Sequence, residues 1–99
     1  MLSYFLLYRT REQTSPTGLF VKSVEHAILW DHREKAWVYD PELVARYLDS
    51  VDNIDRYRKV DRQTAEQAAP QITGGERLPD EETIRWIFQW RGEPPQDDF

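Results

Sequence analysis

The side chains that could bind a metal ion or move a proton are few and are spread along the chain. The two histidines, His26 and His32, stand near the carboxylates of Asp31 and Glu34. Zinc sites on one helix commonly use two histidines four positions apart, and neither that spacing nor an HExxH pattern occurs. We therefore expect no metal site, and we interpret both histidines as surface or hydrogen-bonded residues.

Three aspartates, Asp49, Asp52 and Asp55, recur at a spacing of three. Paired carboxylates catalyse proton transfer only where a pocket raises one pKa, and these stand in polar sequence at a predicted helix end. They also lack the alternating ligands and the glycine of a calcium loop. We interpret them as solvated caps and turn residues.

Other catalytic motifs are missing from the sequence. The chain has no cysteine, no GxSxG nucleophile elbow and no glycine-rich phosphate loop. We expect no cofactor, and the missing motifs favour a protein that is not an enzyme. Catalytic groups brought together only by the fold stay open as an alternative.

A basic stretch, RYRKVDR, surrounds Tyr57 with positive charge. Its basic residues are Arg56, Arg58, Lys59 and Arg62. Basic residues interleaved with an aromatic can contact single-stranded nucleic acid. However, Asp55 and Asp61 flank the stretch and the formal net charge is −5, which disfavours binding to phosphate backbones and anionic membranes. Solvated ion pairs are the ordinary interpretation, so nucleic-acid binding is only an alternative here.

The segment LPDEETIRWIFQWRG is the clearest helix pattern in the chain. Ile84, Ile87 and Phe88 form one apolar stripe, and Trp86 and Trp90 form a ridge beside it. At 100° per residue the combined apolar arc is about 200°, which a small domain rarely covers with its own residues. Either the loops around Pro70 and Pro79 fold over this ridge, or the ridge is a contact surface. Because tryptophan is frequent among interface hot spots, we predict partner binding here. Behind it we place the aromatic residues Trp30, Trp37 and Tyr39.

The elements that must position these residues begin with strands. Alternating apolar residues predict a strand over about 2–10, and TSPTG at 14–18 predicts a turn in which Gly18 can adopt a positive φ. Extended patterns follow at 19–22 and 24–30. The polar DHREK then separates two aromatic flanks and predicts a hairpin with a contact between Trp30 and Trp37 across it.

Helices are predicted over 41–51, from about residue 61 or 64, and in the last apolar segment. Asp40 and Pro41 suit the start of the first helix, and either Asp61 or Thr64 can cap the second. Pro70 is expected to kink or end that second helix. Residues 54–62 read equally well as a short edge strand or as an irregular connection.

The pattern as a whole predicts an α+β fold. We expect an antiparallel sheet of three to four strands, with two to three helices packed mainly on one face. The length of 99 residues and the 13% aromatic content suit one domain over 1–92, with residues 93–99 as a loosely ordered tail.

These observations favour a small soluble protein-binding module, regulatory or accessory, of the inhibitor, antitoxin-like or immunity-like kind. The partner is another protein or a second copy in a homodimer, and the acidic charge suits a basic partner. The missing cysteine fits a cytoplasmic location, and no run of residues is long enough to span a membrane. The alternatives are a small-molecule-binding domain or small enzyme with an aromatic-lined cavity near His26 and Tyr39, and nucleic-acid binding through residues 56–62.

Overall fold

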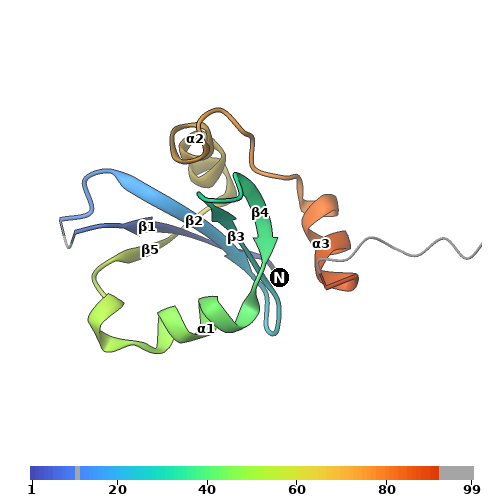
Figure 1. Cartoon of the computed structure of the whole chain (residues 1–99), viewed down its shortest axis with the longest axis horizontal. Helices are drawn as coiled ribbons and strands as arrows, with labels where there is room; N and C mark the ends of the chain where they lie inside the picture. The colour runs from blue at the N-terminus through green and yellow to red at the C-terminus, as the bar shows by residue number, and fades with distance from the viewer. Residues whose placement is uncertain (11, 92–99) are drawn as a thin grey trace, which may run out of the picture.

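A computed structural model describes residues 1–10 and 12–91, which form a five-stranded antiparallel sheet with three α-helices (Figure 1). The strands are β1 (Ser3–Tyr8), β2 (Pro16–Lys22), β3 (Ala27–Asp31), β4 (Ala36–Tyr39) and β5 (Tyr57–Val60). The helices are α1 (Pro41–Asp49), α2 (Arg62–Thr73) and α3 (Glu81–Gln89), with a 3-10 turn, η1 (Val51–Asn53), after α1. The predicted α+β class is confirmed, but the sheet has more strands than the three to four expected. The predicted tail, 93–99, lies outside the described residues.

The sheet order is β4-β3-β2-β1-β5, and each neighbouring pair runs antiparallel. The central strands β1 and β2 are apolar on both faces, so both faces need a cover. Helices α2 and α3 pack on one face, while α1 packs on the other (Figure 1). The expectation that helices lie mainly on one face therefore holds for α2 and α3 but not for α1.

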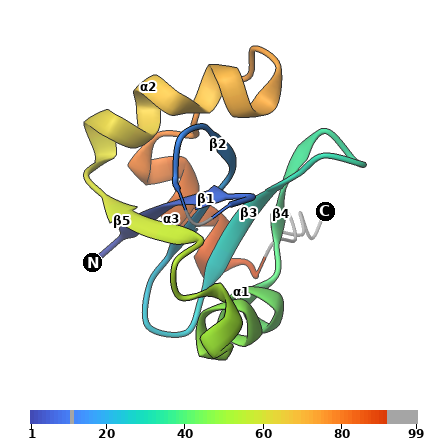
Figure 2. The ribbon, with the colours of Figure 1, turned by 90° about the vertical axis from the view of Figure 1, so that its left-hand side faces the viewer.

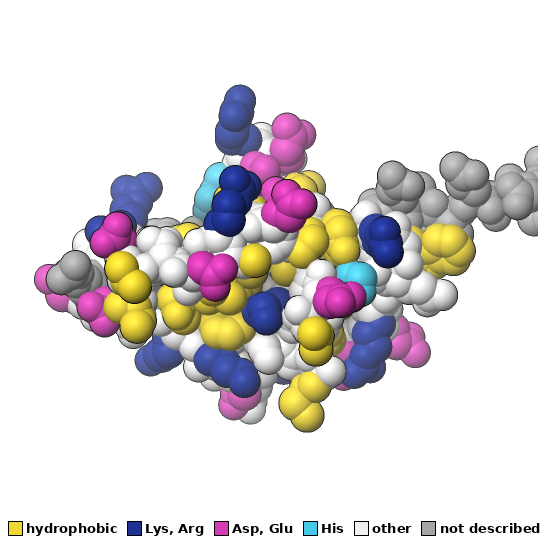
Figure 3. Space-filling view, turned by 90° about the horizontal axis from the view of Figure 1, so that it is seen from below, with side chains coloured by type: hydrophobic (Ala, Val, Ile, Leu, Met, Phe, Trp, Pro, Cys, Tyr) yellow, Lys and Arg dark blue, Asp and Glu magenta, His cyan; other side chains and the backbone are white. Residues whose placement is uncertain are grey.

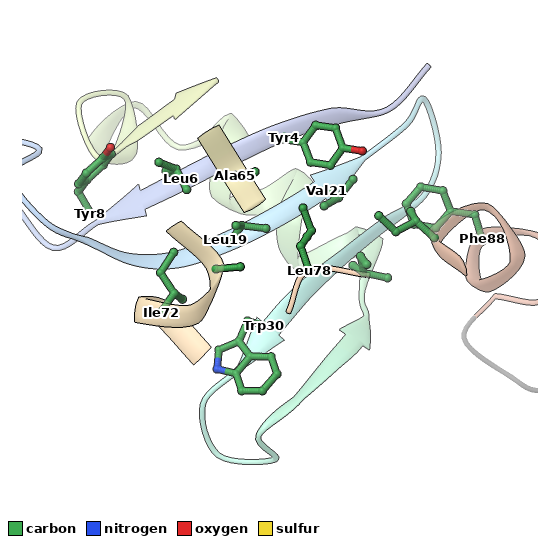
Figure 4. Close-up of a cluster of buried hydrophobic side chains, with 13 residues drawn as sticks. Tyr4, Leu6, Tyr8, Leu19, Val21, Trp30, Ala65, Ile72, Leu78 and Phe88 are labelled. Atoms are coloured by element: carbon green, nitrogen blue, oxygen red, sulfur yellow. The ribbon is translucent and has the colours of Figure 1, made fainter. Parts of the chain in front are cut away.

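The larger core lies between the sheet and the pair α2 and α3. Figure 4 shows side chains from β1, β2 and β3 meeting those of α2 and of the segment after it. Leu19, Ile28 and Ile84 are fully buried there. The fully or largely buried members are Tyr4, Leu6, Tyr8, Leu19, Val21, Ile28, Trp30, Ala65, Ala69, Ile72, Leu78, Ile84 and Phe88.

The smaller core lies under α1. Phe5 and Phe20 stack with ring centroids 4.8 Å apart, and Tyr47 of α1 meets Phe20 edge-on at 6.5 Å. Val44 is the buried residue of α1. This face is covered incompletely, because Leu43 is 42% exposed and Val51 and Ile54, which follow α1, are 81% and 63% exposed. Figure 3 views the molecule from this side and shows hydrophobic side chains interspersed with charged ones.

The β3–β4 hairpin forms as predicted around DHREK. Trp30 and Trp37 are directly paired across the two strands, with ring centroids 5.4 Å apart in an edge-to-face arrangement. The Asp31 carboxylate closes the loop by accepting hydrogen bonds from the backbone N–H groups of Arg33 and Glu34, at 2.8 and 3.0 Å. The predicted aromatic contact across the hairpin is therefore confirmed.

Strand β2 begins earlier than the turn pattern indicated, at Pro16. Gly18 lies inside the strand, and the described glycines with positive φ are Gly74 and Gly75. The reason for a glycine is close approach, because a Cβ at position 18 would lie 2.9 Å from Cδ1 of Leu7. The prediction that Gly18 serves the turn through a positive φ is therefore wrong.

Residues 54–62, which the sequence left undecided between strand and connection, contain strand β5, which pairs with β1 from Tyr4 opposite Val60 to Leu7 opposite Tyr57.

Strand β3 starts later than expected, at Ala27, because residues 23–26 form a turn. That turn is closed by a hydrogen bond of 2.9 Å from the Ser23 N–H to the His26 carbonyl.

Helix α2 is capped by Asp61, whose carboxylate accepts from the Thr64 N–H at 2.8 Å. The helix continues through Pro70 to Thr73 and ends at Gly74, which has a φ of 76°. Pro70 removes only the bond to the Glu66 carbonyl, and both residues are exposed, so water can take over that carbonyl. Of the two predicted effects, a kink or an end at Pro70, the end is contradicted, because the helix runs on to Thr73 and Pro70 lies within its last turn.

Two cap carboxylates predict an acid-sensitive component of stability. The pKa of Asp61 is lowered below 3.8 by hydrogen bonds from the side chain and backbone of Thr64, and that of Asp80 by the equivalent bonds from Thr83. Between these lowered pKa values and the ordinary value of 3.8, the unfolded chain therefore binds more protons than the folded protein does. The stabilisation is fully present above pH 3.8 and is lost as the pH falls through the lowered values.

Replacing both residues, Asp61→Asn and Asp80→Asn, should remove this component, because asparagine caps a helix about as well but does not titrate. Denaturant unfolding followed between about pH 5 and about pH 2 should show a steeper loss of stability in the wild type than in the double variant. Equal pH dependence in the two proteins would show that the caps do not contribute.

Candidate functional site

Helix α3 stands at the end of the sheet opposite the β1–β2 connection (Figure 1). It starts where Asp80 accepts a hydrogen bond of 2.9 Å from the Thr83 N–H, and Glu81 and Glu82 place negative charge at the positive end of its dipole. Trp90 ends it, with its N–H bonded to the Trp86 carbonyl at 3.0 Å. Local sequence thus favours a helix at this place, while packing against the protein stabilises it and decides which face is turned inward.

Two residues anchor α3 to the rest of the protein. Ile84 is fully buried, and Phe88 is 6% exposed. The Phe88 ring stacks on His26 at 5.4 Å and meets Tyr39 edge-on at 6.3 Å. Nδ1 of His26 and the hydroxyl of Tyr39 are 2.8 Å apart and form a hydrogen bond. This ring cluster fixes the orientation of the helix about its own axis.

The same orientation turns the two tryptophans of α3 outward. At 100° per residue, Trp86 and Trp90 lie about 200° and about 240° around the helix from Ile84, and so away from the anchored side. Their exposed fractions are 43% and 41%, and Ile87 beside them is half-buried. We call Trp86 and Trp90 the tryptophan ridge. The described loops leave both indoles accessible, so the ridge remains a candidate contact surface.

The other three predicted partner-binding residues lie on the sheet face beneath α2 and α3. Trp30 is 5% exposed, so it is a core residue. Trp37 is half-buried, and its indole Nε1 is buried with no hydrogen-bond partner among the described residues. Tyr39 is half-buried and contacts Phe88. The structure therefore connects Tyr39 to α3 as a support, and it separates the buried Trp30 from any exposed surface.

The four basic residues of the nucleic-acid alternative do not gather on one surface. Arg58 and Lys59 are adjacent in strand β5 and so project from opposite faces of the sheet. Arg62 is committed to internal contacts, donating to the Tyr4 hydroxyl and the Pro79 carbonyl, each at 2.9 Å, and to Glu66 at 2.6 Å. Through these contacts Arg62 links the sheet, α2 and the segment before α3.

The small-molecule alternative requires an aromatic-lined cavity near His26 or Tyr39. A hollow of about 260 Å³ reaches His26, but the turn before it and one side of α1 supply the other walls, with no further aromatic ring. A larger hollow of about 620 Å³ lies between α2 and the segment leading to α3, and charged residues make up five of its nine lining residues, with no aromatic ring among them. Specific small-molecule pockets are mostly apolar and about 300–1,000 Å³, so neither hollow fits that description well.

Comparisons with protein-family models, with curated proteins and with solved structures found no match. Within residues 1–10 and 12–91, no cluster of three or more histidine, aspartate or glutamate side chains could hold a metal ion. Over the same ranges, no helix combines the length and the apolar character needed to cross a bilayer. The assignment of a function therefore depends on the surfaces described above.

Sequence reasoning missed a second feature, the apolar surface after α1. Val51 and Ile54 are more exposed than the tryptophans of α3. The predicted helix over 41–51 included Val51, but α1 stops at Asp49 and Val51 lies in the 3-10 turn that follows. Where a helix ends is weakly encoded, so no pattern in the sequence separates Val51 from the core residues.

Proposed function

We propose that this chain is a small, soluble, non-catalytic protein-binding module with a regulatory or accessory role, and that the tryptophan ridge of α3 is its contact surface. The supporting observation is that Trp86 and Trp90 lie side by side on the outward face of an anchored helix, 43% and 41% exposed. Two adjacent half-exposed indoles are a costly surface to leave in water and are typical of interface hot spots. Inhibitor, antitoxin-like and immunity-like proteins are examples of this class.

The charges around the ridge specify the kind of partner. The N-cap Asp80 and the first-turn residues Glu81 and Glu82 are all exposed, although Arg85 lies 4.0 Å from Glu81, and the whole chain carries a net charge of −5. The proposed partner is a protein with an apolar groove for the indoles and a basic rim facing these carboxylates. Such complementarity speeds association and restricts which proteins can bind. A cytoplasmic location belongs to the same proposal and is supported by the absence of cysteine.

Removal of the ridge should abolish capture of this partner. The double variant Trp86→Ala and Trp90→Ala should keep the circular dichroism of the wild type but bind the partner about thirty-fold or more weakly, since losing a hot spot costs at least about 2 kcal/mol. The partner is first obtained by affinity capture from the native host and mass spectrometry. Its dissociation constant is then measured for both proteins by calorimetry.

The matched control is Val51→Ala with Ile54→Ala, which truncates exposed apolar residues after α1 and should leave the affinity unchanged. If the folded ridge variant retains every captured protein at wild-type affinity, the proposed function of α3 is wrong. If the control variant alone loses binding, the surface after α1 is the contact site instead.

A further inference from the structure

The two edges of the sheet differ in the charge that they carry. Strand β5, at one edge, contains Arg58 and Lys59, whereas β4, at the other, reads Ala-Trp-Val-Tyr and has no charged residue. Charged side chains, lysine above all, prevent other strands from adding to an edge. Figure 2 shows β5 and β4 on opposite sides of the sheet, with no labelled helix beyond the outer side of β4. Edge β4 thus lacks the protection that β5 has.

The backbone of β4 has hydrogen-bonding groups available at this edge. The Asp40 N–H donates to the Ala27 carbonyl at 3.1 Å, immediately beside the pair formed by Tyr39 and Ile28. In an antiparallel ladder, a hydrogen bond between the residues that flank a pair identifies that pair as a non-hydrogen-bonded one. Tyr39 therefore directs its own N–H and C=O away from β3. Tyr39, and Trp37 two positions before it, therefore direct these groups outward. No other described residue bonds to them through its backbone.

We propose that a second copy of this chain pairs with β4, antiparallel, about a two-fold axis that passes beside Val38. Alternation of the outward groups selects this register, because Trp37 must face Tyr39 of the second copy for both residues to exchange hydrogen bonds. Val38 then faces Val38 of the second copy on the α1 side. On the other side each Trp37 is opposite a Tyr39, and aromatic residues directly opposite one another stabilise antiparallel pairs.

Charge at the two ends of β4 favours a second copy over an unrelated strand. The loop before the strand carries Arg33, Glu34 and Lys35, with Lys35 nearest the strand, while Asp40 directly follows the strand. The antiparallel arrangement brings Lys35 of each copy beside Asp40 of the other, whereas a parallel arrangement would place the two lysines together and the two aspartates together. The strand is therefore self-complementary in its hydrogen bonding and in the charges nearest its two ends. This interface uses a different surface from the tryptophan ridge and does not depend on the proposed function.

The test is sedimentation equilibrium on the full chain, with a lysine placed at the axis. The wild type should be a concentration-dependent dimer in the micromolar range. Val38→Lys brings two ammonium groups together and should raise the dissociation constant about tenfold or more. Val24→Lys makes the same change at a residue that is 92% exposed in the β2–β3 turn and should leave the dimer intact. Circular dichroism should be the same for all three proteins.

Amide hydrogen exchange tests the register independently of any variant. The N–H groups of Trp37 and Tyr39 should exchange more slowly as the wild-type concentration rises, while those of Arg58 and Lys59 should not change. A wild type that stays monomeric to submillimolar concentration overturns the inference, as does a dimer that Val38→Lys leaves intact. A dimer lost in the Trp86→Ala, Trp90→Ala variant but kept in Val38→Lys would assign self-association to the ridge and would also overturn it.

Discussion

Phe20→Ala is expected to lower the free energy of unfolding by about 3–5 kcal/mol, enough to remove a large share of the stability of a domain this small. Phe20 is 1% exposed and lies in β2, at the centre of the smaller core. Truncation removes its stacking on Phe5 and its edge contact with Tyr47, and leaves a cavity between the sheet and α1. Urea unfolding followed by tryptophan fluorescence measures the loss.

Leu43→Ala is the comparison for Phe20→Ala. Leu43 lies on α1 but is 42% exposed, so its truncation should cost less than about 1 kcal/mol. Similar losses in the two variants would show that α1 does not bury its inward face as described.

Phe88→Ala should have an equally large but more local effect. Phe88 and Ile84 hold α3 to the protein, and the ring of Phe88 makes the contacts with His26 and Tyr39. If α3 stays docked in the variant, loss of the Phe88 ring should lower the free energy of unfolding by about 3–5 kcal/mol. If undocking of α3 costs less free energy than that, the helix should detach instead while the sheet stays folded. Hydrogen exchange should therefore accelerate in residues 81–89 well before it does in β1 and β2.

Gln89→Ala is the control, because Gln89 is the exposed neighbour of Phe88 on the same helix. It should leave the exchange rates of α3 unchanged. Uniform acceleration across the sheet and α3 in Phe88→Ala would mean that the helix unfolds only together with the main core, contrary to this expectation.

The sheet was largely predictable, because its signal is local. Alternation predicted the first strand over about 2–10, and in the structure its residues Phe5 and Leu7 belong to the smaller core under α1. The helix itself was predicted, but which side it covers depends on how the chain crosses from β4, and no local pattern encodes that crossing. Strand β5 was left undecided for a similar reason, since its pairing partner β1 is about fifty residues away in the sequence.

The candidate site was predictable in part. The wide apolar arc of the last helix allowed either enclosure of Trp86 and Trp90 by loops or an exposed ridge, and the exposed fractions of 43% and 41% favour the ridge. The arc could not reveal that Phe88 would be held by His26 and Tyr39, which belong to a turn and a strand far away in the sequence. Trp30 shows the opposite difficulty, since a hairpin pattern alone does not distinguish a buried indole from an accessible one.

The unequal edges of the sheet also limit how far the protein could polymerise. A sheet with two unprotected edges can add copies at both sides and grow into a filament. Here a copy joined through β4 would present only β5 at each outer margin, and Arg58 and Lys59 would repel a further strand. Growth would therefore terminate at two chains, so a continuous sheet of ten strands with cationic margins is the largest that this fold allows.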